Sequence, residues 1–181
     1  MEIAILSDTH VPEQAERLPD QFREHVDDAD HVVHAGDFGS AAALEDVRKL
    51  ADDLTAVYGN ADPADVDLPS VASVEAGGVT VVVTHGMVNH VEKAVYSSAG
   101  AVYDRDDWLD AVADTARARA DADGPVVGVG GHSHEVEDET HDGVRVLNPG
   151  SATGVGPADG TATMMTVEVN DGDIEVTLHE A

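Results

Sequence analysis

Side chains that can bind metal ions follow five short apolar runs of the sequence, each at the point where the run ends. The five clusters are Ser7-Asp8-Thr9-His10, Gly36-Asp37, Gly59-Asn60, His85-Gly86 and Gly131-His132-Ser133-His134. In an α/β sheet, the loops that follow the strands share one edge, so these side chains are expected to converge although they lie far apart in the sequence. Carboxylate, amide and imidazole groups suit divalent Mn, Fe, Zn, Ni or Co better than a soft metal.

Seven residues of these clusters are candidate ligands, which is too many for one tetrahedral ion. They are Asp8, His10, Asp37, Asn60, His85, His132 and His134. Such a set suits two ions about 4 Å apart that share one bridging carboxylate. Taken alone, Asp8 could cap a helix, and Asp37 or Asn60 could be an ordinary turn residue. Their occurrence together, in order and always after an apolar run, favours a dinuclear metal site.

The apolar runs themselves predict strands buried on both faces, because they are continuous and not alternating. These strands are expected at residues 2–6, 31–35, 55–58, 79–84 and 125–129. Helices are expected between them at about residues 13–28, 40–52 and 105–121, the first bent at Pro19 and the second capped by Ser40. Residues 61–78 indicate a loop plus an edge strand, and residues 87–104 indicate either a helix or a lid over the site.

The last third of the chain changes character and predicts consecutive antiparallel strands at residues 144–147, 162–169 and 174–178. The sequence Asn-Asp-Gly-Asp at residues 170–173 predicts a hairpin turn between the last two strands. A chain that passes from alternating strands and helices to consecutive strands predicts an α/β (α+β) fold of two packed sheets with helices outside. No internal repeat or linker divides the 181 residues, so a single domain over residues 1–181 is expected.

The charge of the chain is extreme, with 9 basic against 37 acidic residues and a formal net charge of −28. This charge argues against stable binding to nucleic acid, because phosphate backbones require Lys and Arg. It is typical of a halophilic protein, since very high salt screens the repulsion between surface carboxylates. The absence of cysteine excludes disulfides, thiolate metal sites and cysteine catalysis. Neither a membrane-spanning run nor a signal peptide is recognisable, so a cytoplasmic protein without membrane contact is expected.

Together these motifs resemble the calcineurin-like metallophosphoesterase superfamily. The short chain and Asn148-Pro149-Gly150-Ser151 look like its small bacterial and archaeal phosphodiesterase branch. The resemblance spans about residues 1–178 and implies a four-layer α/β/β/α sandwich of two mixed sheets flanked by helices. It implies that Asp8, His10, Asp37 and His134 hold a first metal ion, and that Asp37, Asn60, His85 and His132 hold a second, with Asp37 as the bridge. Mn²⁺ is the expected ion, with Ni²⁺, Fe²⁺, Co²⁺ and Zn²⁺ as alternatives.

The chemistry implied by the resemblance is phosphodiester hydrolysis by a metal-activated hydroxide that attacks phosphorus in line. The substrate would be a small phosphate ester, with Asp37, Asn60 and His85 in the catalytic centre. The metals would supply the positive field that so acidic a protein otherwise lacks. Two alternatives stay open: a phosphomonoesterase or nucleotide pyrophosphatase, and an inactive protein-interaction scaffold like the retromer subunit of eukaryotic protein sorting, which resembles the same branch. A homodimer is compatible with the resemblance.

The sequence departs from the family pattern directly after Asn60. Many members carry there a histidine to which protonation of the leaving group is assigned, whereas this chain has Ala61-Asp62. Asp62 is therefore a candidate catalytic residue that orients water or a ligand, against the alternative of a loop cap before Pro63. Ser133 stands where the family more often has Thr and keeps a small hydroxyl. The loop at residues 148–151 is expected beside the last histidine pair, and the other noted histidines are expected outside the ligand set: His34, His90, His141 and His179.

Overall fold

Two mixed sheets form the centre of the computed structural model, which describes residues 1–86, 105–120 and 124–181. The first sheet has the strand order β10-β9-β1-β2-β3 and the second has the order β4-β5-β6-β8-β7. The strands are β1 (Glu2–Leu6), β2 (His31–His34), β3 (Leu54–Ala56), β4 (Val71–Ala76), β5 (Val79–Thr84), β6 (Val126–Val129), β7 (Val136–His141), β8 (Val144–Pro149), β9 (Thr163–Asn170) and β10 (Asp173–Glu180). The helices of the described residues are α1 (Asp20–Asp28), α2 (Ala41–Leu50), α4 (Arg105–Arg119) and the short 3-10 helix η1 (Gly156–Ala158).

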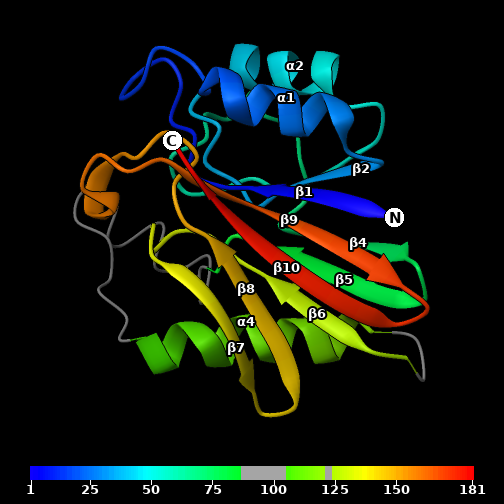
Figure 1. Ribbon diagram of the computed structural model, residues 1–181. Helices are drawn as coiled ribbons and strands as arrows, with labels where there is room; N and C mark the ends of the chain where they lie inside the picture. The colour runs from blue at the N-terminus through cyan, green and yellow to red at the C-terminus, as the bar shows by residue number, and fades with distance from the viewer. Residues whose placement is uncertain (87–104, 121–123) are drawn as a thin grey trace.

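Helices cover the outer face of each sheet, with α1 and α2 on the first sheet and α4 on the second (Figure 1). Within β1, Ala4 packs in the cluster that contains Phe22 of α1, whereas Ile5 belongs to the apolar layer between the two sheets. On the second sheet, Val82 of β5 packs in the cluster that contains Trp108 of α4. The continuous apolar runs therefore bury both faces of the central strands, and the predicted α/β/β/α sandwich is confirmed.

The central strands run parallel, which brings the loops after them to shared sheet edges. In the first sheet, β2 pairs in parallel with both β1 and β3. In the second sheet, β6 pairs in parallel with both β5 and β8. The antiparallel strands lie toward the edges of the sheets. In the first sheet, β9 pairs with β1, and β10 pairs with β9 at the edge; in the second sheet, β4 pairs with β5 at one edge and β7 with β8 at the other.

The first predicted helix is shorter than expected. Helix α1 begins only at Asp20, and Pro19 occupies the N-cap position, while residues 11–14 form a turn. Proline fixes its own φ and lacks an N–H, so it is compatible with the start of a helix and not with its interior. The second helix agrees with the prediction, since Ser40 Oγ accepts the N–H of Ala43 at 3.1 Å at the start of α2.

Strand β7 is absent from the sequence prediction, because Val136–His141 is almost wholly polar. It pairs antiparallel with β8 and is an edge strand of the second sheet, a position where polar residues are typical. The predicted hairpin between the last two strands is present, with positive φ at Asp171 (52°) and Gly172 (90°) as a type I′ turn requires. The prediction for residues 87–104, which includes His90, lies outside the described residues.

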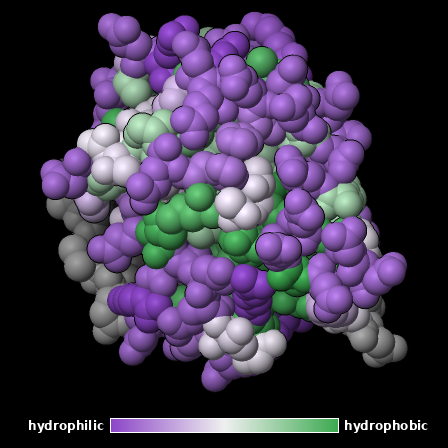
Figure 2. All heavy atoms as spheres, in the orientation of Figure 1, coloured by the Kyte–Doolittle hydropathy of each residue, from purple (hydrophilic) through white to green (hydrophobic). Residues whose placement is uncertain are grey.

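Hydrophilic residues cover most of the molecular face seen in Figure 2, and hydrophobic residues gather near its middle. This distribution is consistent with the many acidic residues of the sequence. Among the helices of the part that the structure describes, none is both long and apolar enough to cross a membrane.

Truncation of Phe22 to alanine should test the helix layer over the first sheet. The ring is fully buried, so Phe22→Ala is expected to lower the free energy of unfolding by about 3–5 kcal/mol, as measured by denaturant titration. The exposed Glu24 of the same helix serves as control, and Glu24→Ala should change stability by less than about 0.5 kcal/mol. Equal effects of the two substitutions would contradict the described packing.

Candidate metal centre

All seven predicted ligands lie at the carboxyl ends of five strands and converge there. Asp8 and His10 follow β1, Asp37 follows β2, Asn60 follows β3, His85 follows β5, and His132 and His134 follow β6. Contacts join the loops of the two sheets: His134 Nε2 lies 3.1 Å from Asp8 Oδ1, and His132 Nδ1 lies 2.7 Å from Asn60 Oδ1. These seven residues are called the candidate metal centre below.

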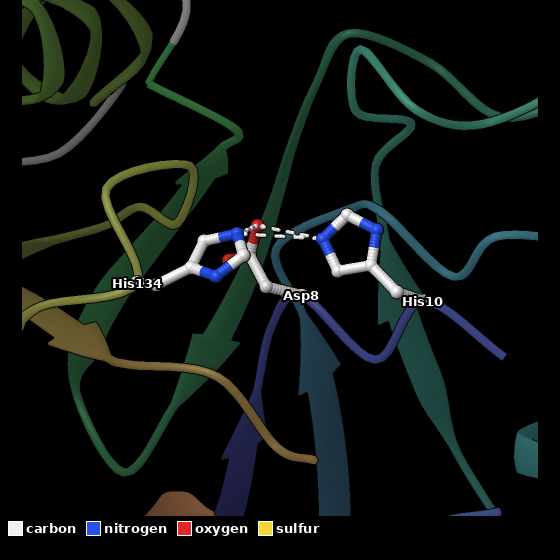
Figure 3. Close-up of side chains that lie close together, drawn as sticks. All are labelled: Asp8, His10 and His134. Carbon is white, nitrogen blue, oxygen red and sulfur yellow. Dashed lines mark hydrogen bonds and ion pairs between the residues drawn. The ribbon is translucent and has the colours of Figure 1, made fainter. Parts of the chain in front are cut away.

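Asp8, His10 and His134 form one group of potential ligands (Figure 3). The carboxylate of Asp8 lies between the two rings, and its Oδ1 is 3.1 Å from His134 Nε2 and 3.8 Å from His10 Nε2. The two Nε2 atoms are 3.3 Å apart. One oxygen and two nitrogens are therefore directed at a common point, as the ligands of a single ion would be.

The second group forms around Asp37, whose Oδ2 lies 3.4 Å from His85 Nε2 and 3.7 Å from His10 Nε2. This carboxylate thus contacts a histidine of each group, which fits its predicted role as a bridge. Asn60 Oδ1 lies 3.1 Å from His85 Nε2 and 2.7 Å from His132 Nδ1. The amide oxygen therefore connects the ring of His132 to that of His85 in the group around Asp37.

Backbone carbonyls orient two of the imidazole rings. His85 Nδ1 lies 2.7 Å from the carbonyl oxygen of Ala35, and His134 Nδ1 lies 2.8 Å from that of Val155. Because a carbonyl can only accept, each Nδ1 donates its hydrogen, and the neutral ring then presents the lone pair of Nε2 to a carboxylate oxygen. Two acceptors repel each other unless a proton or a cation lies between them. The arrangement therefore fits a bound cation.

One oxygen of Asp8 has no hydrogen-bond donor in the described part of the chain. Asp8 is fully buried, and its Oδ2 accepts the backbone N–H of His132 at 3.0 Å, whereas Oδ1 has no hydrogen-bond partner. A buried carboxylate oxygen without a partner is costly. Because this same oxygen faces the rings of His10 and His134, a cation at that point would satisfy it.

The ionisation of these groups follows from their mutual charges. Burial by itself would raise the pKa of Asp8, but the neighbouring imidazoles of His10 and His134 and the nearby charge of His85 hold it far below its usual value. Burial by itself would lower the pKa of His85, but the negative charge of Asp37 and a hydrogen bond to it raise this pKa to about 9. Without metal ions, the centre at neutral pH therefore combines an ionised Asp8 with a protonated His85.

Five of the seven residues have a left-handed backbone conformation, which side chains other than glycine rarely adopt. Their φ angles are 53° at Asp8, 49° at His10, 58° at Asp37, 72° at His132 and 58° at His134. Such residues persist only where the surrounding structure holds them, and they gather at functional sites. No sequence signal indicates this strain, because the residues concerned are not glycines.

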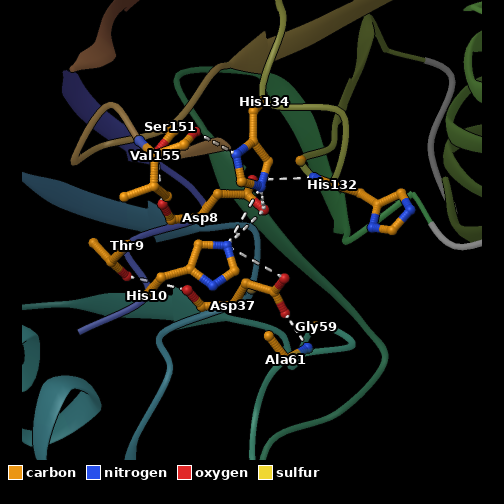
Figure 4. Close-up of polar contacts among 12 residues, drawn as sticks. Asp8, Thr9, His10, Asp37, Gly59, Ala61, His132, His134, Ser151 and Val155 are labelled. Carbon is orange, nitrogen blue, oxygen red and sulfur yellow. Dashed lines mark hydrogen bonds and ion pairs between the residues drawn. The ribbon is translucent and has the colours of Figure 1, made fainter. Parts of the chain in front are cut away.

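The loop after β8 holds the strained backbone of Asp8 (Figure 4). Ser151 Oγ donates to the carbonyl of Asp8 at 2.9 Å and accepts the N–H of Val155 at 3.1 Å. The carbonyl of Val155 in turn orients His134. A single buried hydroxyl thus connects the positions of two residues of the first ligand group.

A side chain near the end of β8 and one of helix α4 support the histidine pair after β6. Asn148 is fully buried, and its Nδ2 donates to Ser133 Oγ at 2.9 Å and to the carbonyl of Gly131 at 3.3 Å. Trp108 Nε1 of helix α4 donates to the same carbonyl at 2.9 Å. Residues 148–151 therefore lie beside the last histidine pair, as predicted.

His34 and Asp62 contact the loops that carry the candidate metal centre. The ring of His34 is fully buried, stacks on Phe38 with centroids 3.6 Å apart, and contacts Thr9 Oγ1 at 3.1 Å. Burial lowers the pKa of His34 to about 3, so the ring is neutral. Asp62 accepts backbone N–H groups with both carboxylate oxygens, and burial raises its pKa despite these bonds.

Two other histidines that were expected outside the ligand set, His141 and His179, lie away from the candidate metal centre. His141 pairs with Asp110 at 2.7 Å on the surface. The ring of His179 lies against that of His25 in a tilted arrangement, with ring centroids 4.0 Å apart. The structure thus brings together all seven predicted ligands and keeps these other histidines apart from them.

Comparison with known proteins gives three findings beside a family match. Residues 1–172 match the model of the calcineurin-like phosphoesterase superfamily domain. A probable metallophosphoesterase of Methanocaldococcus jannaschii is 29% identical over 153 residues, which cover 84% of this chain and 69% of that protein. A solved structure described as a novel archaeal phosphodiesterase is 25% identical with a TM-score of 0.62, covering 99% of this chain and 100% of that one. A Vps29 variant from Entamoeba histolytica is 24% identical with a TM-score of 0.71, covering 100% and 99%.

The raised pKa of His85 should make the metal-free protein less stable at alkaline pH. In the unfolded chain the pKa of a histidine is near 6.5, and in the folded protein that of His85 is about 9. Its stabilising contribution is therefore complete below pH about 6.5 and is lost as the pH rises through 9. After removal of divalent ions with a chelator, the free energy of unfolding should fall over this range by on the order of 1–3 kcal/mol.

The measurement is chemical denaturation at fixed salt concentration between pH 6.5 and 9.5, with His85→Asn as the comparison. The variant lacks the titrating ring and should show a smaller loss over the same range. If wild type and variant lost stability equally, the interaction of His85 with Asp37 would not be the source.

Proposed function

Because the chain belongs to the calcineurin-like phosphoesterase superfamily, we propose that it is a phosphodiesterase dependent on two divalent metal ions, formed by a single domain over residues 1–181. Family membership implies a phosphoester hydrolase that uses divalent metals. The finer proposal depends on one observation, the Nε2 atoms of two carbonyl-oriented rings directed at buried carboxylate oxygens. His134 Nε2 lies 3.1 Å from Asp8 Oδ1, and His85 Nε2 lies 3.4 Å from Asp37 Oδ2.

The proposed ligand sets follow the two groups of contacts. The first ion would be held by Asp8, His10, Asp37 and His134, and the second by Asp37, Asn60, His85 and His132. The position of Asp37 supports its role as the shared ligand, because its Oδ2 lies within 3.7 Å of His10 Nε2 and 3.4 Å of His85 Nε2. These oxygen and nitrogen ligands suit Mn²⁺, the proposed ion, and also suit Ni²⁺, Fe²⁺, Co²⁺ and Zn²⁺.

The residues of the chain prepare this site for an anionic substrate. When bound, two divalent ions would neutralise phosphate charge and supply an activated water for in-line attack on phosphorus. The charges of nearby histidines lower the pKa of Asp8 and Asp37 despite burial, so both carboxylates remain ionised near neutral pH. The carbonyls of Ala35 and Val155 hold the two rings in place.

A phosphodiester is the proposed substrate class. The 25% identity and TM-score of 0.62 to an archaeal phosphodiesterase support a diester. A monoester or nucleotide pyrophosphate substrate is the alternative within the same chemistry.

A catalytically inactive scaffold is the second candidate function. The fold resemblance to Vps29 over the whole chain, with a TM-score of 0.71, is the observation that favours it. The complete ligand set argues against it, because a scaffold has no need for five strained residues in a buried polar cluster.

Loss of the bridging carboxylate should abolish hydrolysis. Purified protein with Mn²⁺ at molar salt is expected to hydrolyse members of a phosphodiester and phosphomonoester panel. Asp37→Asn and His85→Asn should lower kcat/KM by about 100-fold or more because they remove proposed ligands.

The control is His141→Asn, which changes the same residue type on the surface and should keep wild-type activity. Circular dichroism shows whether each variant is folded. A wild-type protein that binds metal but cleaves no ester of the panel would favour the scaffold over the enzyme.

Metal binding should release protons from the site. Since the pKa of His85 is about 9 in the metal-free protein, its ring is protonated at pH 7.5 and must lose the proton to bind an ion. Calorimetry in buffers of different ionisation enthalpy should give two bound ions per chain and at least one released proton. A stoichiometry of one ion, or binding without proton release, would contradict the proposed site.

A further inference from the structure

We propose that Asp62 is a positioning residue, which fixes the loops after β2 and β3 against each other, and that it is not the acid that protonates the leaving group. The inference rests on the proposed function, because it concerns how the candidate metal centre is held in shape. It assigns a role to the side chain that stands two residues after Asn60, in a chain that lacks the histidine many family members carry directly after this asparagine.

The carboxylate of Asp62 accepts three backbone N–H groups from two loops. Its Oδ2 accepts from Asp37 at 3.0 Å and from Gly59 at 2.8 Å, and its Oδ1 accepts from Gly39 at 3.0 Å. Asp37 and Gly39 follow β2, whereas Gly59 and Asp62 itself follow β3. One side chain therefore connects the backbone of the bridging ligand to the residue directly before Asn60.

A fourth bond runs in the opposite direction between the same two loops. Asp37 Oδ1 accepts the N–H of Ala61 at 2.7 Å. Each loop thus supplies a carboxylate that accepts N–H groups of the other. The Oδ1 atom of Asp37 is occupied by this bond, so its Oδ2 is the oxygen directed at His85 and His10.

The loops approach each other so closely that only glycine fits at position 59. A Cβ atom built on Gly59 would lie 2.6 Å from the backbone nitrogen of Asp37, closer than real Cβ contacts. At the same point Asp37 holds a φ of 58°, which is unfavourable for aspartate unless neighbouring groups fix it. The N–H of Asp37 that Asp62 accepts is part of this strained residue, so loss of Asp62 should release the bridging ligand.

The contacts of Asp62 do not suit a proton donor. A general acid must bring an O–H group to the leaving oxygen. Asp62 is only 9% exposed, and N–H donors already occupy both of its oxygens. These N–H groups need acceptors, and a carboxylate serves three of them better than a carboxylic acid or an amide would.

The test compares D62N and D62A with D65N, a matched control that removes the same charge at an exposed position of the same loop. Calorimetry with Mn²⁺ should give a 10- to 100-fold lower affinity for D62N and a larger loss for D62A, with D65N like wild type. Hydrogen exchange at the backbone amides of Asp37, Gly39 and Gly59 should accelerate in D62N. Circular dichroism shows whether each variant is folded. If D62A is unfolded and D62N is folded, the result for D62N decides.

A series of phosphodiesters with leaving groups of increasing pKa separates the two roles. If Asp62 positions the loops, D62N should lower kcat/KM by a similar factor for every ester and leave the shape of the pH profile unchanged. A loss that grows steeply with leaving-group pKa, together with wild-type metal affinity and amide exchange, would overturn the proposal. If wild type binds Mn²⁺ but hydrolyses no ester, the proposed function fails, and metal affinity and amide exchange still decide the role of Asp62.

Discussion

The structure depends on two buried carboxylates, Asp8 and Asp37, whose negative charges repel each other. Both stay ionised inside the protein, and the rings of His85 and His134, each bonded to a backbone carbonyl, direct their Nε2 atoms at them. Such a cluster raises the free energy of the folded chain unless cations or protons occupy it. The hydrogen bonds around the cluster hold the two carboxylates close together despite their repulsion. On the surface, by contrast, acidic side chains face water and need no such support.

Two side chains outside the cluster, Ser151 and Asp62, hold it in place. Ser151 fixes the backbone of Asp8 and, through Val155, the ring of His134. Asp62 fixes the backbone of Asp37 and of Gly59. Both side chains form hydrogen bonds with the main chain of the loops that carry the proposed ligands. Residues outside the ligand set therefore hold the geometry of the centre.

The sequence predicted which side chains converge, but it did not predict the backbone strain and the hydrogen bonds that hold them in place, for a physical reason. Proposed ligands such as Asn60 and His85 follow apolar runs, and parallel strands end at a common edge, so convergence could be inferred from order alone. The strain at His132 and the backbone contacts of Asp62 arise from long-range packing that no local pattern encodes. The same limit explains β7, whose polar residues become a strand only because β8 lies beside them.

The single tryptophan of the chain lies where its emission can report on this centre. Trp108 is buried in α4 and donates its indole N–H to the carbonyl of Gly131, directly before His132. The position of Gly86, next to His85, is also crowded by the indole, since a Cβ built there would meet the ring. A shift of either ligand loop therefore changes the surroundings of one chromophore, and the protein carries its own optical probe for occupancy of the centre.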